Sequence, residues 1–183
     1  MAAALRAVPA QEAEEAEEGP TTAELLRRTL REHAAGVTVI TVPGPAGFTA
    51  TSFTSVSLEP SLVTFFVALT ASTAAAVARA DHFAVHLLGA RHADLAVRFA
   101  ARAVPRFHGV DWTSSPEGVP LLQGVARLTA RTVLRQRVGD HLQVVGALLD
   151  AEPLPGHEPL VHHHGGYATT APLPDAASGT GRS

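Results

Sequence analysis

The sequence predicts a mainly β domain of the barrel type, with a few short helices between its strands. Runs rich in β-branched and aromatic residues recur at Val37 to Val42 (VTVITV), Leu62 to Leu69 (LVTFFVAL) and Phe83 to Leu88 (FAVHLL). Turn signals separate the strand patterns at spacings typical of barrels. The sequence has no βαβ rhythm and no GxGxxG after the first strand, so a nucleotide would not be held in the Rossmann manner.

The composition excludes several classes of function. The 183 residues suffice for one domain, and 46% of them are hydrophobic, which favours a folded core. A formal net charge of −3 lacks the basic surplus of a nucleic-acid binder, so we expect no nucleic-acid partner. The absence of cysteine excludes disulfides, thiolate zinc sites, iron–sulfur clusters and a cysteine nucleophile. Neither a membrane-spanning run nor a secretory signal pattern is visible, so we expect a cytoplasmic protein with no membrane partner.

The chain divides into a domain with a tail on either side. Residues 1–20 carry clustered glutamates between alanines and predict a disordered acidic tail. The predicted domain spans residues 21–170, and residues 171–183, rich in Pro, Ala, Ser and Gly, predict a flexible C-terminal tail. Thr21 and Glu24 have the spacing of a capping box, which predicts a short amphipathic helix ending near His33.

The remaining elements follow from local patterns. A strand is expected from Phe48 to about Ser52, a short helix capped by Ser72 from there to Arg79, and a helix over Ala93 to Ala101. An irregular stretch should cover Val104 to Pro120. The last three strands are expected at Gly124 to Thr132, His141 to Asp150 and Leu160 to Tyr167.

One polar segment, Gly47 to Pro60 (GFTATSFTSVSLEP), has the composition of a ligand cradle. Short hydroxyls suit a ligand that is rich in carbonyls, ring nitrogens and phosphate oxygens. The segment has no general base and no acid before Glu59, so it favours binding over catalysis. A Ser/Thr-rich strand and turn exposed to water is the alternative. The six hydroxyl residues are Thr49, Thr51, Ser52, Thr54, Ser55 and Ser57.

The run TATSFTSVSLEP resembles the TANSFTSVSLDPP signature of the flavin reductase-like family, the short-chain NAD(P)H:flavin oxidoreductases. Six further motifs follow in the family's order, so the resemblance covers about residues 21–170. They are the strand LVTFFVAL, the loop Ala71-Ser72-Thr73, the strand FAVHLL (family FAVNVL), RFHGV at residues 106–110 (family RFxGV), PLLQG at 120–124 (family PxLxGA) and GDHLQVVGAL at 139–148 (family GDHxIxxGxV).

The resemblance implies a fold, a set of cofactors and a set of site residues. The fold would be the FMN-binding split β-barrel of Greek-key type, forming a homodimer with flavin at the interface. Thr51, Ser52, Phe53, Thr54 and Ser55 would line the flavin ring and ribityl chain. Ser72 and Thr73 would bind its phosphate with help from the following helix N-terminus, and Phe107 would pack near the flavin. His141, within Gly139-Asp140-His141, and less strongly Tyr167 would contact the nicotinamide.

The chain departs from the family pattern at two places. Thr51 stands where the family commonly has Asn, and His164 replaces a usual Arg in PLVHHHGGYATT. His162 and His164 would share one face of a strand, as the start of a zinc or nickel site would require. No third ligand is evident nearby, so we expect a substituted family strand and no metal.

Three functions follow from the resemblance. The leading one is an NAD(P)H-dependent flavin reductase that transfers hydride from NADH or NADPH to FMN or FAD and supplies reduced flavin to a partner monooxygenase. Hydride transfer needs no acid or base from the protein, so no catalytic residue is expected beyond those that position the rings. The second is a split-barrel flavoenzyme with tightly bound flavin that acts directly on an organic substrate. The third is a non-enzymatic flavin- or haem-binding module, against which the intact Gly-Asp-His argues.

Overall fold

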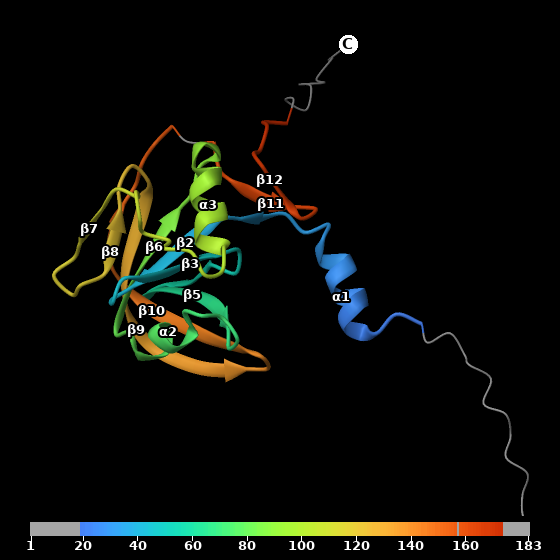
Figure 1. The fold of residues 1–183 in the computed structure, drawn as a ribbon, viewed down its shortest axis with the longest axis horizontal. Helices are drawn as coiled ribbons and strands as arrows, with labels where there is room; N and C mark the ends of the chain where they lie inside the picture. The colour runs from blue at the N-terminus through green and yellow to red at the C-terminus, as the bar shows by residue number, and fades with distance from the viewer. Residues whose placement is uncertain (1–18, 157, 174–183) are drawn as a thin grey trace, which may run out of the picture.

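The computed structural model describes residues 19–156 and 158–173, and one antiparallel sheet of seven strands dominates it (Figure 1). The mainly β fold is confirmed, and the predicted tails lie almost wholly outside the described residues. In spatial order the strands are β3 (Ala46–Ala50), β2 (Thr38–Val42), β6 (His82–Leu87), β9 (Ala126–Val138), β10 (His141–Glu152), β5 (Ser61–Ala68) and β4 (Thr54–Leu58).

The sheet curls into a split barrel whose two edge strands, β3 and β4, do not pair with each other. Residues 51–53 carry the chain from one edge to the other. Ser52 bridges the gap, because its hydroxyl donates to the Phe66 carbonyl at 3.0 Å and accepts from the Phe66 amide at 3.1 Å. Phe48 of β3 also contacts Phe65 of β5, with ring centroids 6.0 Å apart. The seam is therefore joined by side chains and not by a strand ladder.

The barrel interior explains why the central strands form where they do. The β-branched residues of β2 are all buried, since β2 lies between β3 and β6 and the core covers both of its faces. Phe83 meets Phe65 edge to face at 5.1 Å. A second apolar cluster around Phe99 and Leu122 packs the helical side of the sheet.

Helices and small sheets cover the rest of the barrel. The helices are α1 (Thr22–Leu30), α2 (Ala74–Arg79), the 3-10 turn η1 (Ala90–His92) and α3 (Ala93–Ala100). A two-stranded sheet joins β7 (Trp112–Ser114) to β8 (Pro120–Leu122). A three-stranded sheet contains β1 (Ala35–Gly36), β11 (Val161–His163) and β12 (Gly166–Ala168). Within the described residues, no helix combines the length and the apolar character needed to cross a bilayer.

Several boundaries differ from the sequence prediction. The capping box at Thr21 is confirmed, but α1 ends at Leu30 and buries no residue; it stands away from the body in Figure 1. The stretch expected to be irregular contains β7 and ends in β8. β9 continues to Val138, beyond the expected Thr132. The strand expected from Leu160 to Tyr167 is instead the hairpin β11–β12, whose turn residues His164 and Gly165 have φ of 51° and 81°.

Candidate functional site

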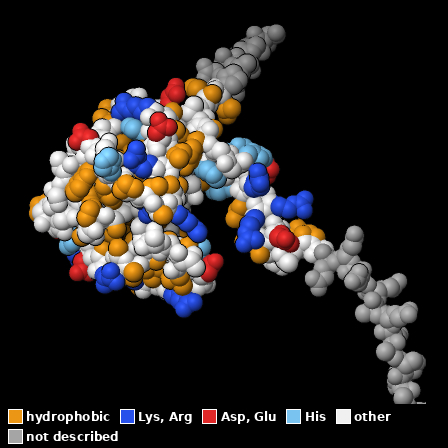
Figure 2. Space-filling view, viewed as in Figure 1, with side chains coloured by type: hydrophobic (Ala, Val, Ile, Leu, Met, Phe, Trp, Pro, Cys, Tyr) orange, Lys and Arg blue, Asp and Glu red, His pale blue; other side chains and the backbone are white. Residues whose placement is uncertain are grey.

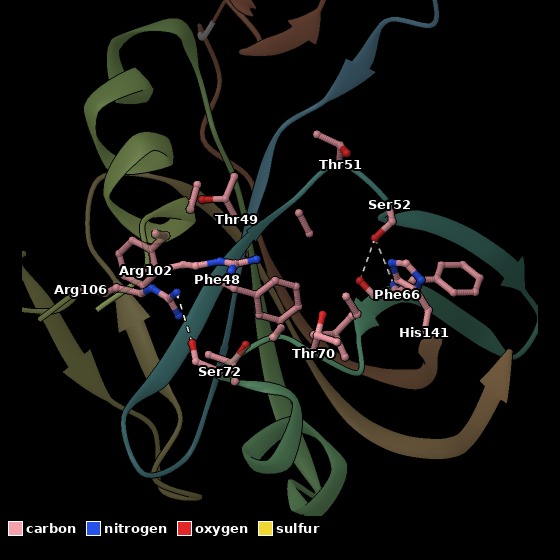
Figure 3. A pocket seen from close by; sticks show the side chains of 17 residues that line it. Phe48, Thr49, Thr51, Ser52, Phe66, Thr70, Ser72, Arg102, Arg106 and His141 are labelled. Atoms are coloured by element: carbon pink, nitrogen blue, oxygen red, sulfur yellow. Dashed lines mark hydrogen bonds between the residues drawn. The ribbon is translucent and has the colours of Figure 1, made fainter. Parts of the chain in front are cut away.

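A cavity of about 540 Å³ opens at the seam of the barrel, beside β3 and β5 (Figure 3). This volume lies within the range of small-molecule and cofactor sites. Six segments that are distant in sequence line it: β3 with the crossing that follows, β5, the loop before α2, the end of α3, the arginine loop after it, and the start of β10. The lining residues are Phe48 to Ser52, Phe66 to Ala68, Thr70 to Thr73, Phe99, Ala100, Arg102, Arg106 and His141.

The polar segment supplies fewer free hydroxyls than its composition predicts. The Thr49 hydroxyl donates to the Ala96 carbonyl at 2.6 Å, and the Ser52 hydroxyl is occupied by Phe66. Thr51 is exposed at the rim of the cavity, and its side chain makes no hydrogen bond within the described residues. Thr51 and Ser52 thus line the cavity, while Ser52 also has a structural role.

The other predicted members of the cradle do not line this cavity. Phe53 packs against the core, and Thr54 and Ser55 are exposed on the edge strand β4. The cavity and the outer side of β4 are thus two different surfaces within one chain.

The loop before α2 places an unpaired hydroxyl at the cavity wall. Thr73, not Ser72 as the sequence predicted, is the N-cap of α2, and its side chain makes no capping hydrogen bond. The Thr73 side chain is buried, and its Oγ1 has no hydrogen-bond partner in the described residues. A buried polar atom without a partner costs free energy, so Thr73 is ready to pair with a ligand atom.

Two arginines complete this end of the cavity. Arg106 is fixed by hydrogen bonds from Nη1 to the Gly47 carbonyl at 2.8 Å and from Nη2 to the Ala101 carbonyl at 2.7 Å. Its Nη2 also lies 3.5 Å from Ser72 Oγ, the contact drawn in Figure 3. Burial lowers the pKa of Arg106 from its ordinary value, but an arginine keeps its charge in proteins.

Arg102 and Arg106 were not among the site residues predicted from the sequence. The signal was present for Arg106, since it opens the RFHGV motif that was used for Phe107. Arg102 has no motif of its own and reaches the cavity only because α3 ends beside β3.

His141 lies at the opposite end of the cavity, at the start of β10, where it pairs with Ala68 of β5. Gly139 and Asp140 form the two-residue turn between β9 and β10, and Gly139 has a φ of 59°. His141 Nδ1 lies 2.7 Å from Asp140 Oδ1, and this hydrogen bond lowers the pKa of the Asp140 carboxyl. Since an ionised carboxylate only accepts hydrogen bonds, Nδ1 carries the proton and Nε2 is left for a ligand.

Phe107 and Tyr167 lie outside this cavity. Phe107 stacks edge to face on Phe99 and Trp112 and lines a neighbouring cavity of about 440 Å³, which shares Ser72, Thr73 and Arg106 with the first. The ring of Tyr167 on β12 meets the ring of His162 edge to face, with ring centroids 5.9 Å apart.

The structure corrects the expected placement of His162 and His164. They do not share a strand face, because His164 leaves the strand for the turn of the β11–β12 hairpin. There its Nε2 lies 3.1 Å from Glu32 Oε2, and it is not among the residues that line the cavity.

Comparison with known proteins gives a consistent result. The family model described as the flavin reductase like domain matches residues 30–171. An NADH:FMN oxidoreductase of Rhodococcus erythropolis is 41% identical over 156 residues, covering 80% of this chain and 81% of the relative. HsaB of Rhodococcus jostii is the reductase subunit of a flavin-dependent monooxygenase. It is 33% identical to this chain over 150 residues, which cover 80% of this chain and 77% of HsaB. The solved structure of SgcE6, an NADH:FAD oxidoreductase of Streptomyces globisporus, superposes with a TM-score of 0.79 at 34% identity, covering 93% of this chain and 97% of that one.

Proposed function

The chain belongs to the flavin reductase-like family, and from this premise we propose that its flavin occupies the cavity at the barrel seam. The protein is an NAD(P)H-dependent flavin reductase. The cavity itself supports this proposal best. Within the family's split barrel it combines an apolar wall, the buried Thr73 hydroxyl, which has no partner in the described residues, and the fixed cation Arg106.

The residues present fit a flavin phosphate at one end of the cavity. Thr73 Oγ1 would gain the hydrogen-bond partner that it lacks, and Ser72 lies beside it. Arg106 and Arg102 supply positive charge at the same end. Hydrogen bonds to a charged group are stronger than those between neutral groups. The proposed phosphate site thus comprises Ser72 and Thr73, which the resemblance implies, together with the two arginines.

The middle of the cavity fits a flat aromatic ring system. Phe48 and the β5 segment from Phe66 to Ala68 line this part of the cavity, and Figure 3 shows Thr51 and Ser52 at its rim. Apolar walls with a few placed polar groups are typical of cofactor sites. We assign the ring to this part of the cavity, with FMN and FAD both possible occupants.

His141 would position the nicotinamide of NADH or NADPH. Asp140 holds its imidazole in one orientation, so that Nε2 can accept a hydrogen bond from a carboxamide. The bound flavin and nicotinamide supply the redox chemistry, namely hydride transfer. The protein's task is to hold the two rings close together and to exclude other geometries. Tyr167 remains a prediction for the nicotinamide side, since it lies outside the cavity of its own chain.

The same premise bears on partners and location. Relatives named as reductase subunits of flavin-dependent monooxygenases support a monooxygenase that receives the reduced flavin.

A homodimer is proposed because apolar side chains are exposed on the edge strand β4 and on β9. A cytoplasmic location is proposed because NADH is produced there. His164, which replaces the family's usual Arg, does not line the cavity of its own chain and so gives no support to the alternative with tightly bound flavin.

Steady-state oxidation of NADH and NADPH with excess FMN or FAD tests the function. Purified protein should turn over free flavin many times per chain. A protein that binds flavin yet oxidises neither nicotinamide would contradict the assignment.

The His141→Ala variant tests the nicotinamide assignment separately. It should raise the apparent KM for NADH by about tenfold, because a hydrogen bond to the ligand is worth roughly 1 kcal/mol or more. Flavin affinity should change little. His33→Ala, an exposed histidine outside the cavity, is the matched control and should leave both constants unchanged.

A further inference from the structure

Three side chains with metal-ligating atoms meet where α1 joins the β11–β12 hairpin. They are Glu32, which follows α1, and His163 and His164, which are more than a hundred residues later in the chain. One ligand atom from each residue lies within 4.8 Å of the other two. Figure 2 shows histidine side chains gathered at this junction, beside an acidic and a basic side chain. Sequence alone gave two histidines and no third ligand, and the fold supplies Glu32.

The backbone of the hairpin brings the two histidines together. Successive side chains of a strand point to opposite faces, so two adjacent histidines on a strand would diverge. His164 instead adopts a φ of 51° in the turn, and its ring centroid lies 4.1 Å from that of His163. A left-handed conformation is uncommon for any residue other than glycine, and histidine is one of the few residue types, with asparagine and aspartate, that adopt it more often.

Backbone contacts hold the acidic ligand against this turn. The His164 amide donates to the Arg31 carbonyl at 3.2 Å, and Arg31 Nη2 donates to the His164 carbonyl at 3.4 Å. These contacts fix the chain at residue 31 and so place Glu32 beside the imidazole of His164, with Oε2 3.1 Å from Nε2. The pair is exposed, at 72% for Glu32 and 51% for His164, so both side chains can adjust to a ligand.

Two imidazole nitrogens and one carboxylate oxygen are a common ligand set for Zn²⁺. Zinc bonds of about 2.0–2.2 Å place tetrahedral ligand atoms roughly 3.3 Å apart. The Glu32–His164 pair already has this separation, and the third atom needs only a small side-chain movement. The fourth coordination position would face water.

We propose that Glu32, His163 and His164 bind a divalent transition-metal ion, Zn²⁺ foremost, that fastens α1 to the β11–β12 hairpin. The helix itself buries no residue, so a bond at its C-terminal end would restrict it strongly. The proposal is independent of flavin reduction, since none of the three residues lines the cavity at the barrel seam.

Metal titration of the full chain, prepared without an affinity tag and stripped with a chelator, tests the site. Zn²⁺ in competition with a chromogenic chelator should bind saturably at one ion per chain. Co²⁺ should give the visible absorption of a low-symmetry site with nitrogen and oxygen ligands. Glu32→Gln, His163→Asn and His164→Asn should each weaken binding by at least about tenfold, since each removes one of three ligands. All three positions are at the surface, so the variants should fold.

His162→Asn and His33→Asn are the matched controls. His162 belongs to the same run of histidines but lies outside the cluster, and His33 is the neighbour of Glu32. Both variants should bind Zn²⁺ like the original chain. Addition of Zn²⁺ should slow backbone hydrogen exchange over residues 22–34 in the original chain and in these two controls. It should not slow exchange in the three variants that lack a ligand. Absence of saturable binding, or binding lost in His162→Asn but kept in Glu32→Gln, would overturn the proposal.

Discussion

His86 is completely buried, and its two ring nitrogens join three parts of the fold. It lies on β6; Nδ1 is 3.1 Å from the Val39 carbonyl of β2, and Nε2 accepts from the Leu122 amide of β8 at 3.0 Å. One nitrogen must donate and the other must accept, so the ring is neutral. Burial lowers the pKa of His86 to about 4.

His86 therefore makes folding depend on pH in a defined window. The unfolded chain takes up a proton near pH 6.5, whereas the folded chain resists it until about pH 4. Above about pH 6.5, His86 is neutral in both states and does not change the free energy of unfolding. As the pH falls from 6.5 to about 4, only the unfolded chain is protonated, which lowers the free energy of unfolding by roughly 3 kcal/mol in all. His86→Asn, which keeps one donor and one acceptor and matches the family's FAVNVL, should remove this dependence. Urea unfolding at pH 5 and at pH 7.5 measures it; an equal pH difference in both proteins would contradict the assignment.

Thr73 permits a second prediction at the same scale. Thr73→Val should leave the unliganded protein as stable or more stable, because the hydroxyl has no partner to lose. The same change should weaken FMN binding by about tenfold, since a hydrogen bond to a charged group contributes roughly 1.5–3 kcal/mol. Riboflavin, which lacks the phosphate, should bind both proteins equally.

Thr41→Val is the matched control for Thr73→Val. The Thr41 hydroxyl is buried but donates to the Pro120 carbonyl at 2.6 Å, away from the cavity. Its loss should lower the free energy of unfolding by about 1 kcal/mol and leave FMN affinity unchanged. If Thr73→Val weakened riboflavin and FMN equally, Thr73 would not contact the phosphate.

At the scale of the element, β10 depends on a glycine at its centre. A Cβ on Gly146 would lie 2.4 Å from the Phe83 ring and 3.0 Å from the Ala130 side chain. Both neighbours belong to the buried core and cannot turn away. Gly146→Ala should therefore lower the free energy of unfolding by roughly 1–3 kcal/mol, as overpacking does. Gly36→Ala on β1, where a Cβ meets nothing, should change it by less than about 0.5 kcal/mol.

A second variant identifies the cause of that loss. Phe83→Leu removes the ring that the new methyl group would strike, so Gly146→Ala should cost less in the Phe83→Leu background than alone. Thermal unfolding of the four proteins in the cycle measures the coupling. Additive losses would mean that Gly146 is needed for its backbone and not for the space that it leaves.

The strands that sequence predicted best are those surrounded by the core. VTVITV is β-branched throughout, which suits a strand whose two faces are both covered, and this composition is visible without the fold. The second half of β9 gave no such signal. Beyond Thr132 its residues are mostly exposed, and its strand conformation comes from pairing with β10. The turn at His164 and Gly165 was missed because His is unusual where such turns favour Asn.

The candidate site was predictable in its motifs but not in its contacts. Ser72, Thr73 and His141, which the motifs singled out, line the cavity, and their roles toward flavin and nicotinamide stay predictions. That the hydroxyls of Thr49 and Ser52 are occupied by backbone groups depends on α3 and β5, which are far away in sequence. Arg102 likewise lines the cavity only because α3 ends next to it. Such pairings are set by tertiary packing, for which one sequence carries no direct signal.

At the scale of the whole molecule, a single chain leaves an apolar strand edge open. β4 ends the seven-stranded sheet, and no strand within the described residues pairs with its outer edge. Leu58 and Val56 on this strand are 84% and 53% exposed, and Val133 and Leu134 of β9 are also exposed. Unpaired, apolar edges invite association, and proteins that stay monomeric usually protect them with charge. A second copy of the chain would cover this surface and place Thr54 and Ser55 at the interface.

A paired change on β4 tests the homodimer. Val56→Asp with Leu58→Asp should convert a dimer into a monomer, because burying two carboxylates without partners is costly. Sedimentation equilibrium across a range of concentrations gives the mass of each protein. Leu173→Asp is the matched control, since Leu173 is 89% exposed and lies outside the barrel strands, and it should remain a dimer. If the original chain sediments as a monomer throughout, or if the β4 variant stays dimeric, the edge is not the interface. Loss of flavin turnover together with the dimer would further mean that the site needs both copies.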